Sequence, residues 1–127
     1  MHIFRLIPIK TLADAGPGAY DIFVNDDNTQ GPWDGSMEHP FQHIQDAVDF
    51  AIDYDMIYVY DGTYYERITI SKSVTLRGAY KTSVFLDGSD TGDVVTITAD
   101  NVTFEHFTIR NGNNGVRVKG DYTEIRY

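Results

Sequence analysis

Residues 95–109 read VTITADNVTFEHFTI, and this stretch decides the fold because it repeats one short pattern. It holds three apolar-Thr-apolar triplets separated by short turns: Val95-Thr96-Ile97, Val102-Thr103-Phe104 and Phe107-Thr108-Ile109. In an extended strand, the first and third residues of a triplet point to one face and the middle residue points to the other. Each triplet therefore predicts a very short strand whose outer two residues face a core.

Similar triplets continue on both sides of this stretch. They occur at 57–59, 68–70, 74–76, 84–86, 116–118 and 123–125. Taken every third one, the triplets form three series that start at 57, 84 and 107, at 68, 95 and 116, and at 74, 102 and 123. Self-similarity at a period of 20–30 residues is typical of a solenoid. We predict an all-β fold, a right-handed three-sheet parallel β-helix of about three coils, at 57–83, 84–106 and 107–127.

The triplets also predict the core. We expect the following side chains to point inward: Ile57, Val59, Ile68, Ile70, Val74, Leu76, Val84, Leu86, Val95, Ile97, Val102, Phe104, Phe107, Ile109, Val116 and Val118. The middle residues should face solvent, and the glycines between triplets suit turns.

A different pattern precedes the triplets. Residues 22–24 (IFV) predict a first strand, 25–39 a polar loop, and 40–53 an amphipathic helix with His39 at its cap. The apolar face of this helix should hold Phe41, Ile44, Val48, Ala51 and Ile52. We expect the helix to cover the first coil, whose end would otherwise expose apolar side chains and backbone. Residues 1–20 are predicted to be an irregular tail, and 21–127 a single β-helix domain, with 21–56 as its strand, loop and cap helix and 57–127 as its coils.

The charge is unevenly distributed. The chain has a net charge of −9, and residues 11–66 hold twelve acidic side chains and no Lys or Arg. This distribution argues against nucleic acid as a partner, since nucleic-acid binding needs basic patches. No run of 18 apolar residues exists, so we expect no membrane insertion.

Three stretches resemble the N-terminal end of pectin-lyase-like, right-handed parallel β-helix repeat proteins of the archaeal and bacterial surface type. They are IFVNDDNTQGPWDGSMEHPFQHIQDAVDFA, MIYVYDGTYYERITISKSVTLRGAY and VFLDGSDTGDVVTITADNVTFEHFTIRNGNNGVRV. The resemblance implies the fold and a secreted or surface-exposed protein with further coils. Its members include lyases, hydrolases, epimerases and surface proteins, so it does not select an activity. The catalytic residues of its enzymes usually lie on middle coils, and none can be carried over to this chain.

No catalytic residue emerges from the pattern. Glycosidases need two carboxylates across a groove, but Glu124 is the only carboxylate among the outward positions of the predicted ladders. The Asn-Thr-Asp, Asp-Asp, Gly-His-Gly and Arg-Ile-Lys motifs of polygalacturonase-like enzymes do not occur in the strand region. We therefore expect this chain itself to be non-catalytic.

The residue types and their spacing suggest two candidate metal sites. The opening of the polar loop mimics a calcium-binding EF-hand, but Met37 stands where that loop needs a carboxylate. An irregular calcium site remains open, with oxygen ligands from Asp26, Asp27, Asn28 and Asp34, against the alternative of an Asx-rich turn. His39 and His43 have no third ligand nearby in the sequence, which favours a capping and a surface histidine over zinc or copper. We assign no cofactor.

Aromatic residues suggest a polysaccharide as ligand. In the predicted register Tyr58 and Phe85 stack on one outer face, with Tyr60 and Trp33 nearby. Flat rings on a rigid sheet suit stacking against sugars, although outward aromatics also stabilise strand ladders.

The sequence thus indicates a non-catalytic structural or adhesion module, extracellular or on the cell surface, with a carbohydrate-contacting face. The alternative is the N-terminal part of a polysaccharide lyase or glycoside hydrolase whose active site lies in later coils. The third predicted coil leaves apolar surface uncovered, because no polar cap follows it. We expect either further coils or another copy of the chain there, and favour a fragment of a longer β-helix.

Overall fold

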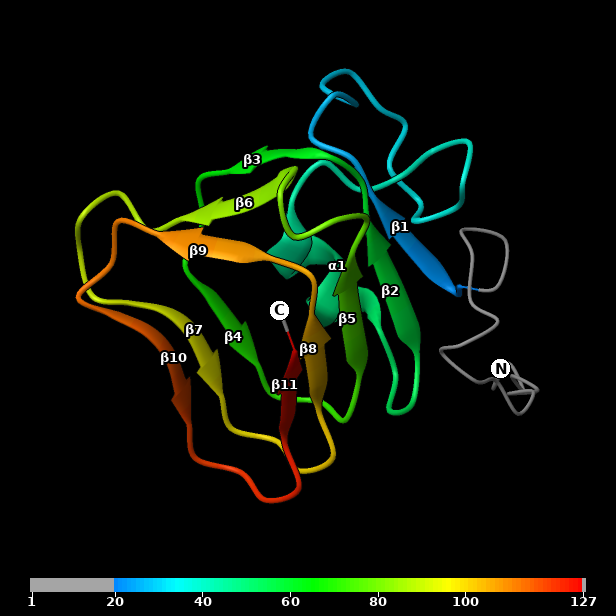
Figure 1. The fold of residues 1–127 in the computed structure, drawn as a ribbon. Helices are drawn as coiled ribbons and strands as arrows, with labels where there is room; N and C mark the ends of the chain where they lie inside the picture. The colour runs from blue at the N-terminus through cyan, green and yellow to red at the C-terminus, as the bar shows by residue number, and fades with distance from the viewer. Residues whose placement is uncertain (1–19, 127) are drawn as a thin grey trace.

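Within residues 20–126, the part of the chain that the computed structural model describes, the triplets form short parallel strands in three sheets (Figure 1). The first sheet has the order β1 (Ile22–Val24), β2 (Met56–Val59), β5 (Thr75–Gly78), β8 (Thr103–Glu105), β11 (Glu124–Arg126). The second contains β3 (Gly62–Tyr64), β6 (Val84–Asp87) and β9 (Thr108–Arg110). The third contains β4 (Ile68–Ile70), β7 (Asp93–Ile97) and β10 (Asn114–Val118).

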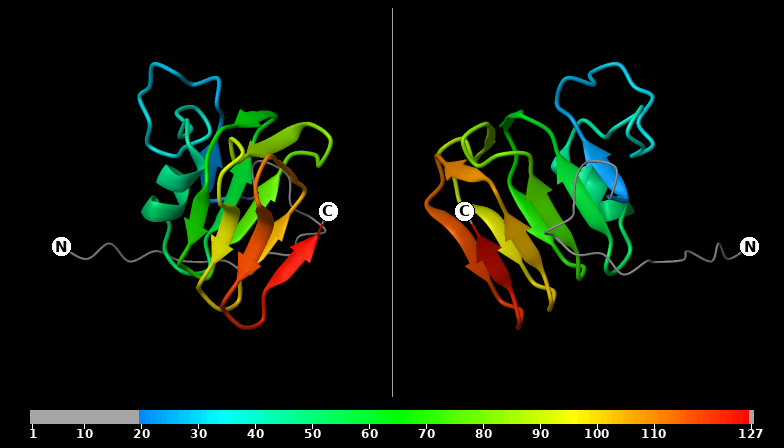
Figure 2. Two further views of the ribbon diagram at one scale, coloured as in Figure 1. Left: turned by 90° about the vertical axis from the view of Figure 1, so that its left-hand side faces the viewer. Right: turned by 45° about the vertical axis from the view of Figure 1, so that its right-hand side comes forward.

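The chain visits the three sheets in the same order in each coil, as β2-β3-β4, β5-β6-β7 and β8-β9-β10. Every strand pair is parallel, and Figure 2 shows the coils stacked along one axis. The predicted three-sheet parallel β-helix is confirmed.

One of the three predicted series is wrong in its first step. The triplet at 57 does not stack on that at 84, because Ile57 pairs with Ile22 and Leu76 in the first sheet. The step from 84 to 107 is confirmed, since Phe85 pairs with Thr108 and Leu86 with Ile109. The partner of the strand at 84–86 is β3, which pairs Thr63 with Phe85. The pattern of apolar triplets missed β3, since Gly62-Thr63-Tyr64 carries only one large apolar side chain. The other two series have the predicted register, through Ile68, Val95 and Val116 and through Leu76, Phe104 and Ile125.

The predicted core is confirmed in the first two coils, and the predicted inward side chains become more exposed in the third. The inward residues from Ile57 to Phe107 are all buried. Ile109 and Val116 are only partly buried, and Val118 is 41% exposed. These side chains lie in the last strands of the stack, where no further described strand covers them.

The helix is shorter than predicted. Helix α1 spans Ile44–Phe50, not 40–53. Phe41 instead extends along β1, because its N–H donates to the Phe23 carbonyl at 2.9 Å. His39 is therefore not the cap. His43 holds that position and makes no side-chain cap hydrogen bond. Ile52 lies beyond the helix and is 45% exposed, so the predicted apolar face ends at Ala51.

Side chains from the first coil attach α1 to the end of the third sheet. The Glu66 carboxylate accepts hydrogen bonds from the backbone N–H groups of Ile44 at 2.7 Å and Gln45 at 3.0 Å. At the other end of the helix, the Lys72 ammonium donates to the Ala51 carbonyl at 2.6 Å. Between them, the Gln45 amide donates to the Thr69 carbonyl at 3.1 Å and accepts from the Thr69 N–H at 2.8 Å. Gln45 thus pairs with the edge of β4 as a neighbouring strand would.

Several acidic side chains join one coil to the next. Asp87 accepts from the Asn111 amide at 2.8 Å, and Asp93 accepts from the Asn114 amide at 2.7 Å. Asp100 accepts from the backbone N–H of Asp121 at 2.7 Å. Carboxylates at strand ends and in a turn therefore hold successive coils together, so part of the acidic composition has a structural role. In the described residues, no helix is long and apolar enough to cross a membrane.

Candidate functional site

A groove runs along the end of the molecule where the lead-in loop, the start of α1 and the β3–β4 connection meet. It consists of three hollows of about 350, 250 and 150 Å³. The first two share Gln42 and His43, and the last two share Tyr65 and Glu66, so the hollows lie next to one another. We call these hollows together the end groove.

Trp33 forms one end of the end groove, with Phe41 and Asp46 beside it. The indole is 48% exposed, and its Nε1–H donates to the Asn28 carbonyl at 2.7 Å. A Cβ at Gly31 would lie 3.1 Å from the ring atoms, and Gly31 has φ +70°. Glycine is therefore needed at 31, because it lets the backbone lie flat against one face of the indole. The ring is held in position while about half of its surface stays open.

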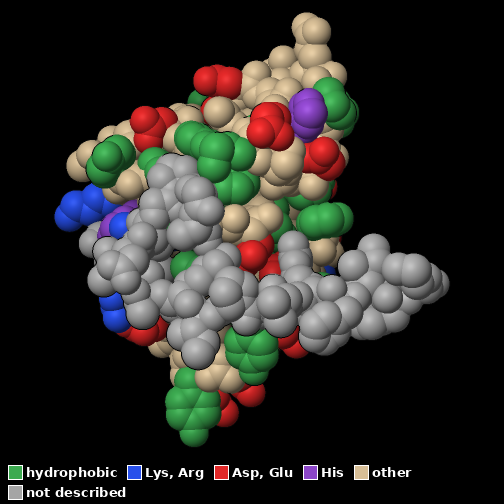
Figure 3. Space-filling model, turned by 90° about the vertical axis from the view of Figure 1, so that its right-hand side faces the viewer, with side chains coloured by type: hydrophobic (Ala, Val, Ile, Leu, Met, Phe, Trp, Pro, Cys, Tyr) green, Lys and Arg blue, Asp and Glu red, His purple; other side chains and the backbone are tan. Residues whose placement is uncertain are grey.

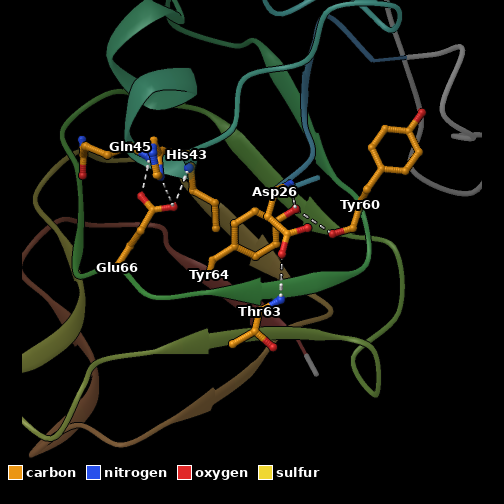
Figure 4. A network of polar contacts seen from close by, with 8 residues as sticks. Asp26, His43, Gln45, Tyr60, Thr63, Tyr64 and Glu66 are labelled. Carbon is orange, nitrogen blue, oxygen red and sulfur yellow. Dashed lines mark hydrogen bonds and ion pairs between the residues drawn. The ribbon is translucent and has the colours of Figure 1, made fainter. Parts of the chain in front are cut away.

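Glu66 lies at the centre of the end groove, beneath the start of α1 (Figure 4). Its side chain is only 11% exposed, and His43 Nδ1 lies 4.0 Å from Oε2. Burial raises the pKa of Glu66, although the two backbone N–H groups and His43 oppose this shift. The more exposed His43 and the neighbouring Gln42 present donors and acceptors to solvent above it.

The floor of the central hollow is built by Tyr64 and Asp26 (Figure 4). The buried Tyr64 hydroxyl donates to the Tyr60 carbonyl at 2.9 Å and accepts from the Asp26 N–H at 3.2 Å. Burial raises the pKa of Tyr64. Asp26 Oδ2 accepts from the Thr63 N–H at 3.3 Å, while Oδ1 is buried without a partner. Burial, and next the charge of Asp27, raise the pKa of Asp26.

The far end of the groove is polar. Tyr65 is 69% exposed beside Arg67, whose guanidinium donates to the Thr91 hydroxyl. Asp87 and Ser89 complete this hollow. The Ser89 N–H donates to Asp87 at 2.8 Å and lowers the pKa of that carboxyl. An exposed aromatic ring thus stands at one end, at Trp33, and a second, Tyr65, stands where the central and the polar hollow meet. Gln42 and His43 lie between the two rings.

The structure separates the predicted sugar-stacking pair. Tyr58 lies in the first sheet, in register with Phe23 and Arg77, whereas Phe85 lies in the second sheet between Thr63 and Thr108. The prediction that the two rings share one face is wrong, because it depended on the incorrect series. Tyr58 also packs with Tyr60 at a ring distance of 5.1 Å, and the Arg110 guanidinium covers the Phe85 ring at 4.5 Å.

The residues suggested for calcium have separate partners. Asp26 faces Thr63, the Asn28 amide donates to the carbonyls of Pro32 and Pro40, and Asp34 accepts from the Ser36 N–H at 2.8 Å. Asp27 is exposed. Within residues 20–126, no three His, Cys, Asp or Glu side chains are grouped so as to hold a metal ion.

Of the predicted sugar-stacking residues, only Trp33 lines the end groove, and of the suggested calcium ligands only Asp26 does. The sequence analysis did not find Gln42, His43, Tyr65 or Arg67 as a group. They come from two segments more than twenty positions apart, which meet only because α1 lies over β4. The connection at Tyr65 and Glu66 was the available signal, since loops on a rigid scaffold often carry function.

Comparison with known proteins gives one structural match and no sequence match. No family model matches the chain, and no curated protein matches it by sequence. Among solved structures, the chain is similar to the pectin methylesterase PemA from Erwinia chrysanthemi, with a TM-score of 0.56 and 22% identity.

The protein has a three-sheet parallel β-helix fold. The match covers 72% of this chain but only 30% of the pectin methylesterase. This β-helix therefore corresponds to about a third of the solved enzyme. At this level of identity, the similarity establishes the fold alone.

Proposed function

We propose that this chain is a non-catalytic, carbohydrate-binding β-helix module of a secreted or cell-surface protein. The end groove is the observation that carries the proposal. Trp33, at one end, and Tyr65, between the central and the polar hollow, expose 48% and 69% of their surface. Sugar rings combine apolar faces with hydroxyl groups, so they suit sites in which flat aromatics alternate with hydrogen-bonding side chains. Gln42 and His43 supply such groups between the rings, and Arg67 supplies another beyond Tyr65.

The bonding of the central carboxylates favours binding over catalysis. Both oxygens of Glu66 already accept backbone N–H groups at the start of α1. One oxygen of Asp26 accepts from Thr63, and the other is buried under the groove surface. A catalytic acid or base must reach the substrate within hydrogen-bond distance. Here the two carboxylates instead hold the walls of the groove in place.

A second candidate function is favoured by the structural comparison. The similar solved structure is an enzyme, and this chain spans 30% of it. The chain could accordingly serve as the end of a polysaccharide-processing enzyme, with the reacting groups on coils other than those described. In that case the end groove would hold substrate at a distance from the reaction.

The first test is binding of a panel of soluble oligosaccharides, measured by calorimetry. We expect Trp33→Ala and Tyr65→Ala each to weaken binding by about five- to tenfold, since losing one aromatic contact costs ~1–1.4 kcal/mol. Tyr80→Ala is the matched control, because Tyr80 is 68% exposed but does not line the end groove. Circular dichroism should show the same fold for all variants.

Product analysis by mass spectrometry separates the two candidates. The binding module leaves every oligosaccharide in the panel intact, whereas catalysis by this chain would release shortened or de-esterified products. If no oligosaccharide binds, or if Tyr80→Ala weakens binding as much as Trp33→Ala, the end groove is not a carbohydrate site.

A further inference from the structure

The end groove lies in the acidic part of the chain. Residues 20–66, which supply most of its lining, hold eleven acidic side chains and no Lys or Arg. Figure 3 shows Asp and Glu over the lead-in loop, and Lys and Arg gathered toward the C-terminal coils. Arg67 does line the polar hollow, but its guanidinium donates to the Thr91 hydroxyl. A ligand between Trp33 and Tyr65 therefore meets carboxylates and no Lys or Arg among the described residues.

The start of α1 offers no free N–H groups to an anion. Helix N-termini bind anions through such groups, but here Glu66 already accepts from those of Ile44 and Gln45, at 2.7 and 3.0 Å. The Glu66 side chain is 11% exposed, and His43 lies 4.0 Å from it, so any positive charge on His43 is already balanced. A uronate carboxylate placed here would face Glu66 and also Asp46, in the first turn of the helix. Like charges in one site oppose binding, so the groove disfavours anionic glycans.

The carboxyl groups of the groove respond to this excess of negative charge. Burial is the largest cause of the raised pKa values of Glu66 and Asp26. The charge of Asp46 raises the pKa of Glu66 further, and the charge of Asp27 does the same for Asp26. A positive group in the groove would relieve this repulsion.

The hollow at Trp33 contains the partners that an ammonium group needs. Trp33, Phe41 and Asp46 line this one hollow of about 350 Å³. Asp46 is exposed, and its carboxylate makes no hydrogen bond or ion pair with any described residue. The Trp33 indole is 48% exposed and is held by its hydrogen bond to the Asn28 carbonyl. Cations bind the faces of aromatic rings, Trp most strongly, and a nearby carboxylate adds a charge-assisted hydrogen bond.

The length of the groove fits a chain of sugars better than a small amine. A single amine would occupy only the Trp33 hollow, whereas the groove continues past Gln42 and His43 to the exposed ring of Tyr65. Each ring of an amino-sugar oligosaccharide has an apolar face for stacking and hydroxyl groups for hydrogen bonds. Such a chain can place one ammonium beside Asp46 while a neighbouring sugar contacts Tyr65.

We propose that the end groove binds an oligosaccharide of amino sugars, with a protonated amine in the Trp33–Asp46 hollow, and rejects uronate glycans. This inference rests on the proposed carbohydrate binding and specifies the class of its ligand. Asp46 determines the specificity for the charged amine, and Trp33 contributes to binding of charged and uncharged sugars alike.

The test compares an oligosaccharide of glucosamine with the same oligosaccharide after N-acetylation, by calorimetry at about pH 6, where the free amine is protonated. We expect the free-amine form to bind about tenfold more tightly, the combined effect of one ion pair and one cation–π contact. An oligogalacturonate should bind more weakly than either form. Sodium chloride at about 1 M should reduce the preference, because it screens charges.

Two matched variants assign the preference to the groove. Asp46→Asn should remove it and leave binding of the N-acetylated form within about twofold. Glu38→Gln removes an exposed carboxylate that does not line the groove, and should keep the preference. Circular dichroism checks that both variants are folded. A preference that persists in Asp46→Asn would come from the bulk of the acetyl group and overturns the inference.

The same measurements separate this inference from the proposed function. If the two glucosamine forms bind equally, or if the oligogalacturonate binds most tightly, the groove takes another class of glycan and only the inference is wrong. If no oligosaccharide binds, the proposed carbohydrate binding and the inference both fail.

Discussion

At the scale of single residues, Asp26 connects the lead-in loop to the first coil. It lies so close to β3 that a Cβ at Gly62 would come within 2.3 Å of Oδ1. Its other oxygen accepts the Thr63 N–H. Burial without full hydrogen bonding raises the pKa of Asp26 above its usual value near 3.8.

This shift predicts a pH dependence of stability. Since the pKa of Asp26 is raised on folding, the native state binds more protons than the unfolded state in the window above 3.8. The contribution of Asp26 to the free energy of unfolding is thus present below that pH and is lost as pH rises through the raised pKa. Asp26→Asn should match the wild type at low pH and be more stable at pH 7.

Urea unfolding of both proteins at a series of pH values measures this difference. Asp34 and Asp87 have lowered pKa values, so their contributions change below 3.8, outside the window. The raised pKa of Glu66 does fall in the window, but Glu66 is present in both proteins, so its contribution cancels in the difference. A constant difference between Asp26→Asn and the wild type across the window would show that Asp26 is not titrating in a buried site.

At the scale of elements, α1 depends on the first coil for its termini. The helix has only seven residues, which is too short to be stable alone. Glu66 and Lys72 satisfy backbone groups at its two ends, and Gln45 pairs with β4. In return the helix covers the end of the core with Ile44, Ala47 and Val48.

Gln45→Ala tests this attachment. The change removes two hydrogen bonds to the Thr69 backbone and leaves the edge of β4 to water. We expect the free energy of unfolding to fall by about 1–2 kcal/mol, at roughly 0.5–1.5 kcal/mol for each hydrogen bond. Gln30→Ala, in the exposed lead-in loop, should change it by less than about 0.5 kcal/mol. Equal effects of the two changes, measured by urea unfolding, would mean that Gln45 does not hold the helix to the sheet.

At the scale of the whole molecule, the inward-facing side chains of β7 and β10 compare the interior of the stack with its end. Ile97 and Val118 are directly in register in β7 and β10, yet Ile97 is fully buried and Val118 is 41% exposed. The difference arises because another strand follows β7 and none follows β10 among the described residues.

The two positions should therefore respond differently to a charge. Ile97→Asp buries an unpaired carboxylate at a cost of several kcal/mol, comparable with the roughly 5–15 kcal/mol stability of a whole domain, and should abolish folding. Val118→Asp should cost less than about 1 kcal/mol, because water reaches the side chain. Far-UV circular dichroism and urea unfolding measure both effects, and a folded Ile97→Asp variant would contradict the observed register.

The sequence by itself determined the solenoid and the presence of a capping helix. It also determined which side chains of nearly every triplet face the core. Alternation within Val95-Thr96-Ile97 and recurrence at 116 are local properties of the chain, so they can be read without coordinates. The register of the second sheet could not be read, because β3 lacks the apolar pattern and is held by Asp26 and backbone pairing to Phe85.

Only the tertiary structure decided the candidate sites. It separated Tyr58 from Phe85 and brought Trp33, His43 and Tyr65 along one groove. The physical reason is that the coils differ in length, from 19 residues between Met56 and Thr75 to 28 between Thr75 and Thr103. Which turns stack on which is therefore set by strand pairing across the coils, and no local pattern in the chain records it.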